Sequence, residues 1–574
     1  MSRVRRTILA SVAAVASATM LAACGSSGGG KNDNNGTGSN AVKAPTKQTN
    51  NNVNGMATTA RSAIKPGGTM TWALSQVIPN FNYYEVDGTL LDNSNMMNAM
   101  LPRPFHFTAS GVPSVNTDYY TSITKTSSNP QTIEYKINPK AKWSDGTPIT
   151  WEDLKDLWLA TNGKNKKFNI SGSQGWENIA SITRGADDQD AIVKYATPYT
   201  DWQSLFDPLV PKSLTATPNS FNKGWVAKPL VTAGPFKWGS TNKTAKSYTI
   251  VRDPNWWGDK AELDSITFVA YNDPSAAIQA VGSGDLDYDD ITFGDEVGNV
   301  QAAKGYQGVQ IRQAGSNIYR QFTLNTKDPI LSDEKVRQAV VLGIDRKAIT
   351  TALIGKLGGS PTPLQNHFFM KNQAPYEETC GDYCTYNAAK AKSLLESDGW
   401  TMKNGYYEKN GKQLSIAITI PSQTPNSKSE SEIAQSTLKA AGIKLTLQTV
   451  PTDDFFSKYI IPGKFQLTTF TWIGTAFPVG GALAIFKYDP KSPGQNYGFG
   501  GSAAINQMLT TASTAATSDE ENKLANDASK AMWANAAWLP LYQKPQATAV
   551  KATLVNIGAY GFADIRYQDI GYKA

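Results

Sequence analysis

The sequence predicts an α/β protein whose body is divided into two or more lobes. Segments in which apolar residues alternate, as in strands, occur between segments whose apolar residues recur with the 3.6-residue period of helices. About 510 residues follow residue 65, which is too long for one hydrophobic core. Aromatic residues make up 10% of the chain and include 14 Trp, enough for a core and for an aromatic-lined cleft.

Residues 1–23 are expected to be an export signal. Three Arg lie within residues 3–6, and an apolar run rich in Ala and Val extends over residues 8–23. The run is too short for a good membrane span, as is typical of signal peptides. It leads into "LAAC", which resembles a bacterial lipobox, so Cys24 is expected to be lipidated. The alternative is an ordinary secretory signal followed by a chance Cys.

Residues 24–65 are expected to be a flexible tether. Gly, Asn, Ser and Thr dominate this segment, so it cannot bury enough apolar surface to offset its ordering entropy. Residues 1–65 carry the whole formal net charge of +7, which leaves the body neutral. A neutral body lacks the electrostatic footprint of a nucleic-acid-binding protein, whereas a basic tether beside a lipid suits an anionic membrane surface.

The first strand of the body is predicted in residues 67–76. Met70, Trp72 and Leu74 alternate with small or polar residues, and Pro79 then breaks the pattern. A loop at a strand end is therefore expected to follow residue 76.

The stretch "AKWSDGTPITWEDLKDLW", residues 141–158, holds four carboxylates that invite a catalytic interpretation. Asp145 and the Gly that follows it predict a turn. Thr150 is placed to cap a helix whose N3 residue is Asp153, a variant of the capping box. The Leu and Trp residues of the same segment supply a buried face. The stretch is therefore interpreted as architecture.

The second half of the body continues the alternation of strands and helices. Residues 317–326 are predicted to be extended. Apolar residues from Val336 to Ile344 then recur on one helix face, with Ser332 as the expected N-cap. A helix stopped by Gly442 and a following strand repeat the pattern.

Catalytic, metal and cofactor sites are not predicted. The sequence has no G-x-x-x-x-G-K-[ST], H-E-x-x-H or G-x-G-x-x-G motif. Residues 253–264 imitate a calcium loop only in part, because Trp257 and Asp264 stand where oxygen ligands and a Glu are needed. His106 and His367 are the only His, and both lie in aromatic surroundings typical of structural residues. A glycosidase-like pair of carboxylates remains open.

Cys380 and Cys384 lie in "CGDYC". An exported protein meets oxidising conditions, so a short-loop disulfide is expected. The alternative is a pair of zinc ligands, although His367 is the only His even loosely near.

Together these segments resemble the extracytoplasmic solute-binding proteins of ABC importers, in particular the peptide/nickel-binding family with its oligopeptide- and dipeptide-binding members. The resemblance covers almost the whole body, and the segments follow in family order. They are "AKWSDGTPITWEDL", "PYTDWQSLFDPLVP", "TAGPFKW", "VRDPNWWGDKAELDSITF", "AIQAVGSGDLD", "FTLNT", "DEKVRQAVVLGIDRKAI", "YNAAKAKSLLESDGW" and "AGIKLTLQTV".

The resemblance implies a two-lobed, periplasmic-binding-protein-like clamp of class II, in its large peptide-binding form. Lobe I would be discontinuous, comprising residues 66–316, with an extra subdomain at about 101–219, and a return over residues 544–574. Lobe II would comprise residues 317–543. Two extended crossings, Asn317–Leu324 and Leu539–Pro545, would form the hinge. A solute, in most members a peptide, would close the lobes and be delivered to the permease of an ABC importer by a monomeric, lipid-anchored protein outside the cytoplasm.

The resemblance also implies where the ligand binds, namely in the cleft between the lobes. The implied contacts are Gln76, Asn80, Asn82 and Tyr83 in lobe I, Tyr319 at the hinge, and Trp472, Gly474 and Tyr497 in lobe II.

One segment departs from the family pattern. Peptide binders commonly have an Asp after the Trp of this strand, where it pairs with the α-amino group of the ligand. Here the run is "TWIGTAFPVGG", which contains no acid. The ligand is therefore expected to be a modified peptide, a peptide held by its backbone, or a non-peptide such as an oligosaccharide; the shortage of His disfavours nickel. A secreted lipoprotein hydrolase and an adhesion or signalling lipoprotein remain alternatives.

Overall fold

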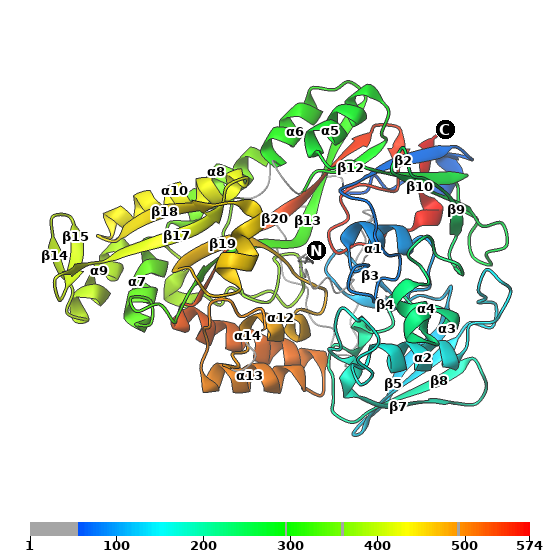
Figure 1. Cartoon of the computed structure of the whole chain (residues 1–574), viewed down its shortest axis with the longest axis horizontal. Coiled ribbons are helices and arrows are strands. Elements are labelled where there is room, and N and C mark those ends of the chain that lie inside the picture. The colour runs from blue at the N-terminus through cyan, green and yellow to red at the C-terminus, as the bar shows by residue number, and fades with distance from the viewer. Residues whose placement is uncertain (1–54, 293–295, 358–360, 491–493) are drawn as a thin grey trace, which may run out of the picture.

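One ten-stranded mixed sheet passes through both lobes of the molecule (Figure 1). The computed structural model describes residues 55–292, 296–357, 361–490 and 494–574. Strands and helices alternate along the described chain, which confirms the predicted α/β class. In sheet order the strands are β18 (Lys444–Val450), β17 (Ser415–Pro421), β19 (Leu467–Ile473), β13 (Val309–Leu324), β20 (Trp538–Lys551), β12 (Tyr288–Asp290), β2 (Thr69–Leu74), β11 (Ser265–Ala270), β10 (Ser247–Arg252) and β9 (Phe236–Asn242).

The two lobes are joined by the long antiparallel strands β13 and β20, drawn in green and red at the centre of Figure 1. In lobe I the first half of β13 (309–315) pairs with the second half of β20 (545–551), and in lobe II the second half of β13 (319–323) pairs with the first half of β20 (538–543) and with β19. The register shifts between Gly315 and Tyr319, opposite Pro545 and Gln543. Both predicted hinge crossings are therefore extended, and a β-bulge separates the parts of the sheet that belong to each lobe. The exact lobe boundaries stay a prediction.

Lobe I adds an extra layer to its half of the sheet. A four-stranded antiparallel sheet lies over residues 120–195, within the predicted subdomain, and α2 (Trp151–Thr161) packs on it. Asp153, at N3 of α2, accepts a hydrogen bond from the Thr150 backbone N–H at 2.9 Å, as the capping-box motif predicts. Its other oxygen accepts from the Lys212 N–H at 2.8 Å, so this acid joins two helices.

The remaining elements of lobe I are α1 (Leu91–Met97), β3 (Phe105–Phe107), β4 (Pro113–Val115), β5 (Tyr120–Ser128), β6 (Gln131–Ile137), η2 (Trp176–Asn178), β7 (Ile179–Arg184), β8 (Asp190–Tyr195), η3 (Trp202–Ser204), α3 (Lys212–Thr215), α4 (Pro218–Lys223), α5 (Pro274–Ser283), α6 (Glu296–Lys304), β21 (Leu554–Val555) and η7 (Tyr567–Asp569).

Lobe II surrounds its half of the sheet with helices. α10 (Pro425–Ala440) packs on β17 and β18, and α7 (Glu334–Gly343) packs on α9 (Ala388–Ser397). The predicted helix face at Val336–Ile344 is buried, but the N-cap is Asp333 rather than Ser332, because the Asp side chain accepts from the Lys335 N–H. The remaining elements are α8 (Arg346–Ile354), η4 (Gly355–Leu357), η5 (Gly381–Tyr383), β14 (Thr401–Lys403), β15 (Tyr406–Lys409), β16 (Lys412–Gln413), α11 (Thr452–Asp454), η6 (Phe455–Ile460), α12 (Pro478–Phe486), α13 (Ala503–Ser513) and α14 (Ser518–Asn535).

Residues 55–65 belong to lobe I, so the predicted tether extends too far along the chain. After η1 (Arg61–Ala63), β1 (Ile64–Lys65) pairs with β22 (Gly571–Lys573) at the other end of the chain. Arg61 forms ion pairs with Glu262 and Asp569. The polar composition of residues 55–65 did not indicate this structure, because their packing comes from a short strand in a distant part of the sequence. Cys24, the signal segment and the rest of the tether lie outside the described residues.

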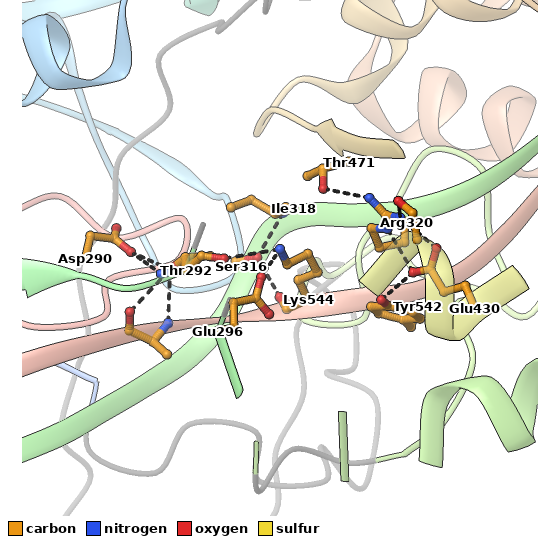
Figure 2. A network of polar contacts seen from close by, with 12 residues as sticks. Asp290, Thr292, Glu296, Ser316, Ile318, Arg320, Glu430, Thr471, Tyr542 and Lys544 are labelled. Atoms are coloured by element: carbon orange, nitrogen blue, oxygen red, sulfur yellow. Dashed lines mark hydrogen bonds and ion pairs between the residues drawn. The ribbon is translucent and has the colours of Figure 1, made fainter. Parts of the chain in front are cut away.

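Figure 2 shows polar contacts on both sides of the hinge, and most of the side chains that make them are buried. On the lobe II side, Arg320 of β13 forms an ion pair with Glu430 of α10 at 2.6 Å. On the lobe I side, Lys544 of β20 pairs with Glu296 of α6. Ser316, within the bulge, donates its hydroxyl to the Lys544 carbonyl at 2.6 Å. Each half of the hinge is thus fixed by a buried ion pair, and the segment between them carries the register shift. Within the described part of the chain, no helix is both long enough and apolar enough to cross a membrane.

Candidate functional site between the lobes

Aromatic side chains from both lobes meet beside the hinge. We define the interlobe aromatic cluster as Phe105, Phe107, Tyr319, Phe470, Trp472, Phe477 and Tyr497. Phe105 and Phe107 lie on β3 of lobe I, and the other members come from β13, from β19 and from the segments that follow β19. The rings of Phe107 and Phe477 touch edge to face, with centroids 5.5 Å apart. Because edge-to-face pairs are favourable beyond the area that they bury, this contact stabilises the lobes against each other.

Trp472 lies at the centre of the lobe II side of this cluster. In the sheet it is the direct partner of Tyr319, and its ring centroid lies 5.0 Å from that of Phe470 and 6.1 Å from that of Tyr497. The side chain is buried, with 8% exposure, yet its indole Nε1–H has no hydrogen-bond partner among the described residues. Buried donors of this kind normally have a partner. The Trp472 N–H is thus a buried donor whose hydrogen-bonding capacity no described residue uses.

Three predicted contacts, Tyr319, Trp472 and Tyr497, are thus brought together by the structure. Tyr319 is buried, whereas Tyr497 is half-buried, and burial raises the pKa of the Tyr497 phenol. Both phenols are consequently neutral at physiological pH, and this wall of the site carries no formal charge. Its surface suits apolar or aromatic groups together with a few hydrogen bonds.

Gly474 is held by the hinge. Its N–H donates to the Asn317 carbonyl at 2.6 Å, and its own carbonyl accepts from the Asn317 amide at 2.9 Å. A Cβ at this position would lie 3.1 Å from the Asn317 carbonyl oxygen, which explains why a residue without a side chain fits here. In the described conformation, Gly474 therefore couples the end of β19 to the hinge.

The four predicted contacts in lobe I lie apart from the aromatic cluster. Gln76 is exposed at the end of β2, and Tyr83 is buried with its ring 6.2 Å from that of Tyr84. Asn80 donates to Glu85 and to the Asn222 carbonyl, and Asn82 donates to the Phe221 carbonyl at 2.8 Å. The amides of Asn80 and Asn82 fix the loop to α4. Their role in ligand binding stays a prediction, as does that of Gln76 and Tyr83.

The lobes also touch at their outer edge, where the subdomain of lobe I meets α12, α13 and α14 (Figure 1). Asp201 of lobe I accepts a hydrogen bond from the Gly480 N–H of α12 at 2.6 Å. The Thr200 hydroxyl donates to the Ser513 carbonyl at 3.0 Å. Asp201 and Glu521 of α14 share a side-chain hydrogen bond. With the aromatic cluster beside the hinge, these contacts make the described conformation a closed one.

The remaining predicted residues have structural surroundings. Cys380 and Cys384 are joined by a disulfide. His106 faces Asp564, which also pairs with the buried Arg103. His367 is enclosed by Ser529 and the Trp538 carbonyl, and burial lowers its pKa to about 3.

Sequence reasoning missed the lobe I side of the interface. The aromatic residues at 105–107 were visible as "PFHF", but that pattern does not reveal which lobe they face. Asp201 lies in the family segment "PYTDWQSLFDPLVP", but nothing in that segment indicates a partner at Glu521, 320 residues further along the chain. Only the tertiary fold brings them together.

Known proteins resemble the chain in sequence and in fold. Residues 114–493 match the model of the bacterial extracellular solute-binding proteins, family 5 (middle). The chain is 37% identical over 515 residues to the oligopeptide-binding protein OppA of Mycobacterium tuberculosis, covering 89% of this chain and 86% of the relative.

Among solved structures, the periplasmic EDTA-binding protein EppA superposes with a TM-score of 0.81 at 24% identity and covers 92% of this chain and 100% of its own. The oligopeptide-binding protein AppA of Bacillus subtilis, in complex with a nonapeptide, superposes with a TM-score of 0.68 at 18% identity, covering 89% and 100%. The two-lobed fold is thereby confirmed. The chain belongs to the bacterial extracellular solute-binding proteins of family 5, which are substrate-binding proteins of ABC importers and not enzymes.

Proposed function

We propose that this protein is a lipid-anchored binding component that captures oligopeptides between its lobes and delivers them to the permease of an ABC importer. The observation that carries the proposal is the interlobe aromatic cluster, whose central Trp472 has a buried Nε1–H that bonds to none of the described residues. The similarity to a named oligopeptide-binding protein over most of both chains supports peptides as the solute class. Lipidation at Cys24 would hold the protein at the outer face of the cell membrane.

The chemistry of the cluster narrows the kind of peptide. No acid occurs in residues 472–478, and the phenols of Tyr319 and Tyr497 are neutral. An α-ammonium group placed against this wall would lose its hydration without gaining a counter-charge, which is unfavourable. The ligand is therefore held through its backbone and its apolar side chains. Gln76, Asn80, Asn82, Tyr83 and Gly474 are proposed as further contacts from the loop and the hinge.

Native mass spectrometry of the purified protein tests the solute class. We expect a co-purified, stoichiometric mass that fragments as a peptide, and no turnover when peptide mixtures are added. A glycan mass would overturn the peptide assignment, and catalytic turnover would overturn the binding function. Trp472→Ala is expected to weaken binding of the recovered peptide by tenfold or more, because it removes the central ring.

A matched pair of peptides tests the recognition mode. The recovered peptide and its N-acetylated form are expected to bind within about threefold of each other, because no carboxylate of the Trp472 strand contacts the terminus. A loss of 100-fold on acetylation would show that an ammonium partner exists elsewhere in the site.

Two further measurements test the anchor and the transport step. Cys24→Ala should release the protein from membranes into the soluble fraction, and continued membrane retention would rule out the lipid anchor. Deletion of the gene should abolish peptide uptake by whole cells, and re-expression of the intact chain should restore it. Unchanged uptake in the deletion strain would contradict delivery to a permease.

A further inference from the structure

Two buried carboxyl groups from opposite lobes meet at the outer edge of the closed interface. Asp201, in the loop after β8 of lobe I, is 3% exposed, and Glu521, in the first turns of α14 of lobe II, is 5% exposed. Their side chains share a hydrogen bond, and Asp201 also accepts from the Gly480 N–H at 2.6 Å. A hydrogen bond between two carboxyl groups requires a proton on one of them, because a carboxylate can only accept.

The proton belongs on Glu521. Its Oε1 has no hydrogen-bond partner among the described residues, so nothing offsets the burial of a charge there. Asp201, in contrast, has a backbone N–H directed at its Oδ2. The geometry therefore describes a neutral Glu521 that donates to an ionised Asp201, and Gly480 donates to the same carboxylate from α12.

No cation compensates this pair within the described part of the chain. Tyr199 and Glu177 are the neighbouring titratable groups of lobe I. On the lobe II side, α12 and α13 contain no charged residue. The acids at 519 and 520 on α14 are exposed, and Lys125 reaches the interface only to donate to the Ala516 carbonyl. The pair therefore depends on a proton rather than on an opposite charge.

We propose that Asp201 and Glu521 form a proton-dependent latch between the lobes, which closes when the pair takes up a proton and loosens when both groups ionise. The latch rests on the proposed function, because closure of the lobes is the step that captures the solute. When the lobes separate, both carboxyl groups enter water and regain their ordinary acidity. Closure at neutral pH must then be accompanied by proton uptake.

The pH dependence follows from the pKa shifts. Burial raises the pKa of Glu521 to about 10 and that of Asp201 to about 6, and the nearby Asp201 charge adds to the shift at Glu521. Because the closed-state pKa values are the raised ones, the contribution to closure is fully present below about pH 4 and is lost as pH rises toward 10. One proton taken up on closing corresponds to a change of up to tenfold in the closing equilibrium per pH unit between about pH 6 and 9.

Hydrogen exchange at α12 measures the latch directly, because the Gly480 amide is bonded across the interface. Exchange of the peptide covering residues 478–486 is followed in the intact protein without added ligand at pH 6 and pH 8, after correction for intrinsic rates. We expect protection in the wild type to fall by up to 100-fold over this interval. Glu521→Gln keeps the size and donates to Asp201 without titrating, so its protection should be equal at both pH values.

The controls separate the latch from simple misfolding and from the proposed function. Asp519→Asn removes an exposed charge from the same turn of α14 and should behave like the wild type. Asp201→Asn removes the neighbouring charge but leaves Glu521 buried, so it should weaken the pH dependence without abolishing it. The latch would be overturned if the wild type were equally protected at pH 6 and pH 8. It would also be overturned if Glu521→Gln lost as much protection between these pH values as the wild type. The assay contains no ligand, so its result tests the latch alone. A failure of the proposed peptide binding would show only in the native mass spectrometry experiment.

Discussion

Replacement of Glu430 by Gln is expected to destabilise lobe II severely. Glu430 is fully buried, and its partner Arg320 has only 3% of its side chain exposed. Oε1 accepts from Arg320 Nε at 2.9 Å and from the Tyr542 hydroxyl at 2.6 Å. Oε2 accepts from Arg320 Nη2 at 2.6 Å and from the Thr469 hydroxyl at 2.8 Å. One carboxylate thus satisfies donors from three strands of the hinge region.

The magnitude follows from the charge that remains. A Gln has nearly the same shape, but it leaves the guanidinium without a counter-charge in a site that water does not reach. Breaking a buried ion pair in this way costs about 3–5 kcal/mol. For a lobe of this size, about 2–4 °C per kcal/mol then predicts a fall in the Tm of lobe II of about 6–20 °C.

Differential scanning fluorimetry at neutral pH measures this shift. Glu432→Gln is the matched control: it lies on the same helix, pairs with Lys428 at 3.9 Å and is exposed, so its Tm should change by less than about 2 °C. The double variant Arg320→Met, Glu430→Met removes both charges and should recover part of the loss. A shift in Glu430→Gln no larger than in the control would refute the reasoning, because it would mean that the guanidinium is solvated or paired elsewhere.

Three further predictions concern stability. Burial lowers the pKa of His367 to about 3, so between pH 6.5 and 3 the unfolded chain binds a proton that the folded chain does not, and the free energy of unfolding should fall by up to about 1.4 kcal/mol per pH unit as the pH drops. In urea titrations His367→Gln should reduce this fall, and an unchanged slope would show that His367 is not its source. Asp153→Ala leaves the Thr150 and Lys212 N–H groups without their acceptor and should cost about 2–4 kcal/mol in the unfolding of lobe I, whereas a loss below about 0.5 kcal/mol would show that water replaces it. Opening the Cys380–Cys384 disulfide in the double Ser variant should cost about 2 kcal/mol, because the loop is short; a loss above about 5 kcal/mol would mean that the bridge supports more than its own loop.

The fold was predictable because its local signals agree with one another. The turn at Asp145, the acid at N3 of α2 and the extended hinge segments each follow from residue types at fixed spacings, and the order of such segments identifies the family. The N-terminal boundary was not predictable in the same way. Ile64 lies in a polar context, and its burial depends on a strand at the other end of the chain.

The candidate site was predictable only in part. Tyr319, Trp472 and Tyr497 follow from the positions that family members use, and adjacent strands bring them together. Asn80 and Asn82 share the same sequence context as a contact loop, but their amides are bonded within lobe I, which no local pattern indicates. The Asp201–Glu521 pair depends on how the two lobes meet, so it has no counterpart in local sequence at all.

The shared strand β20 has a consequence for how the chain folds. In lobe I it lies between β13 and β12, and in lobe II it continues beside β13. Its residues follow the other nine strands of this sheet in the chain, so neither half of the sheet can be completed until residues 538–551 have been synthesised. A chain that must cross a membrane before folding gains from this order, since its earlier segments lack the strand that would let either lobe reach its final structure prematurely.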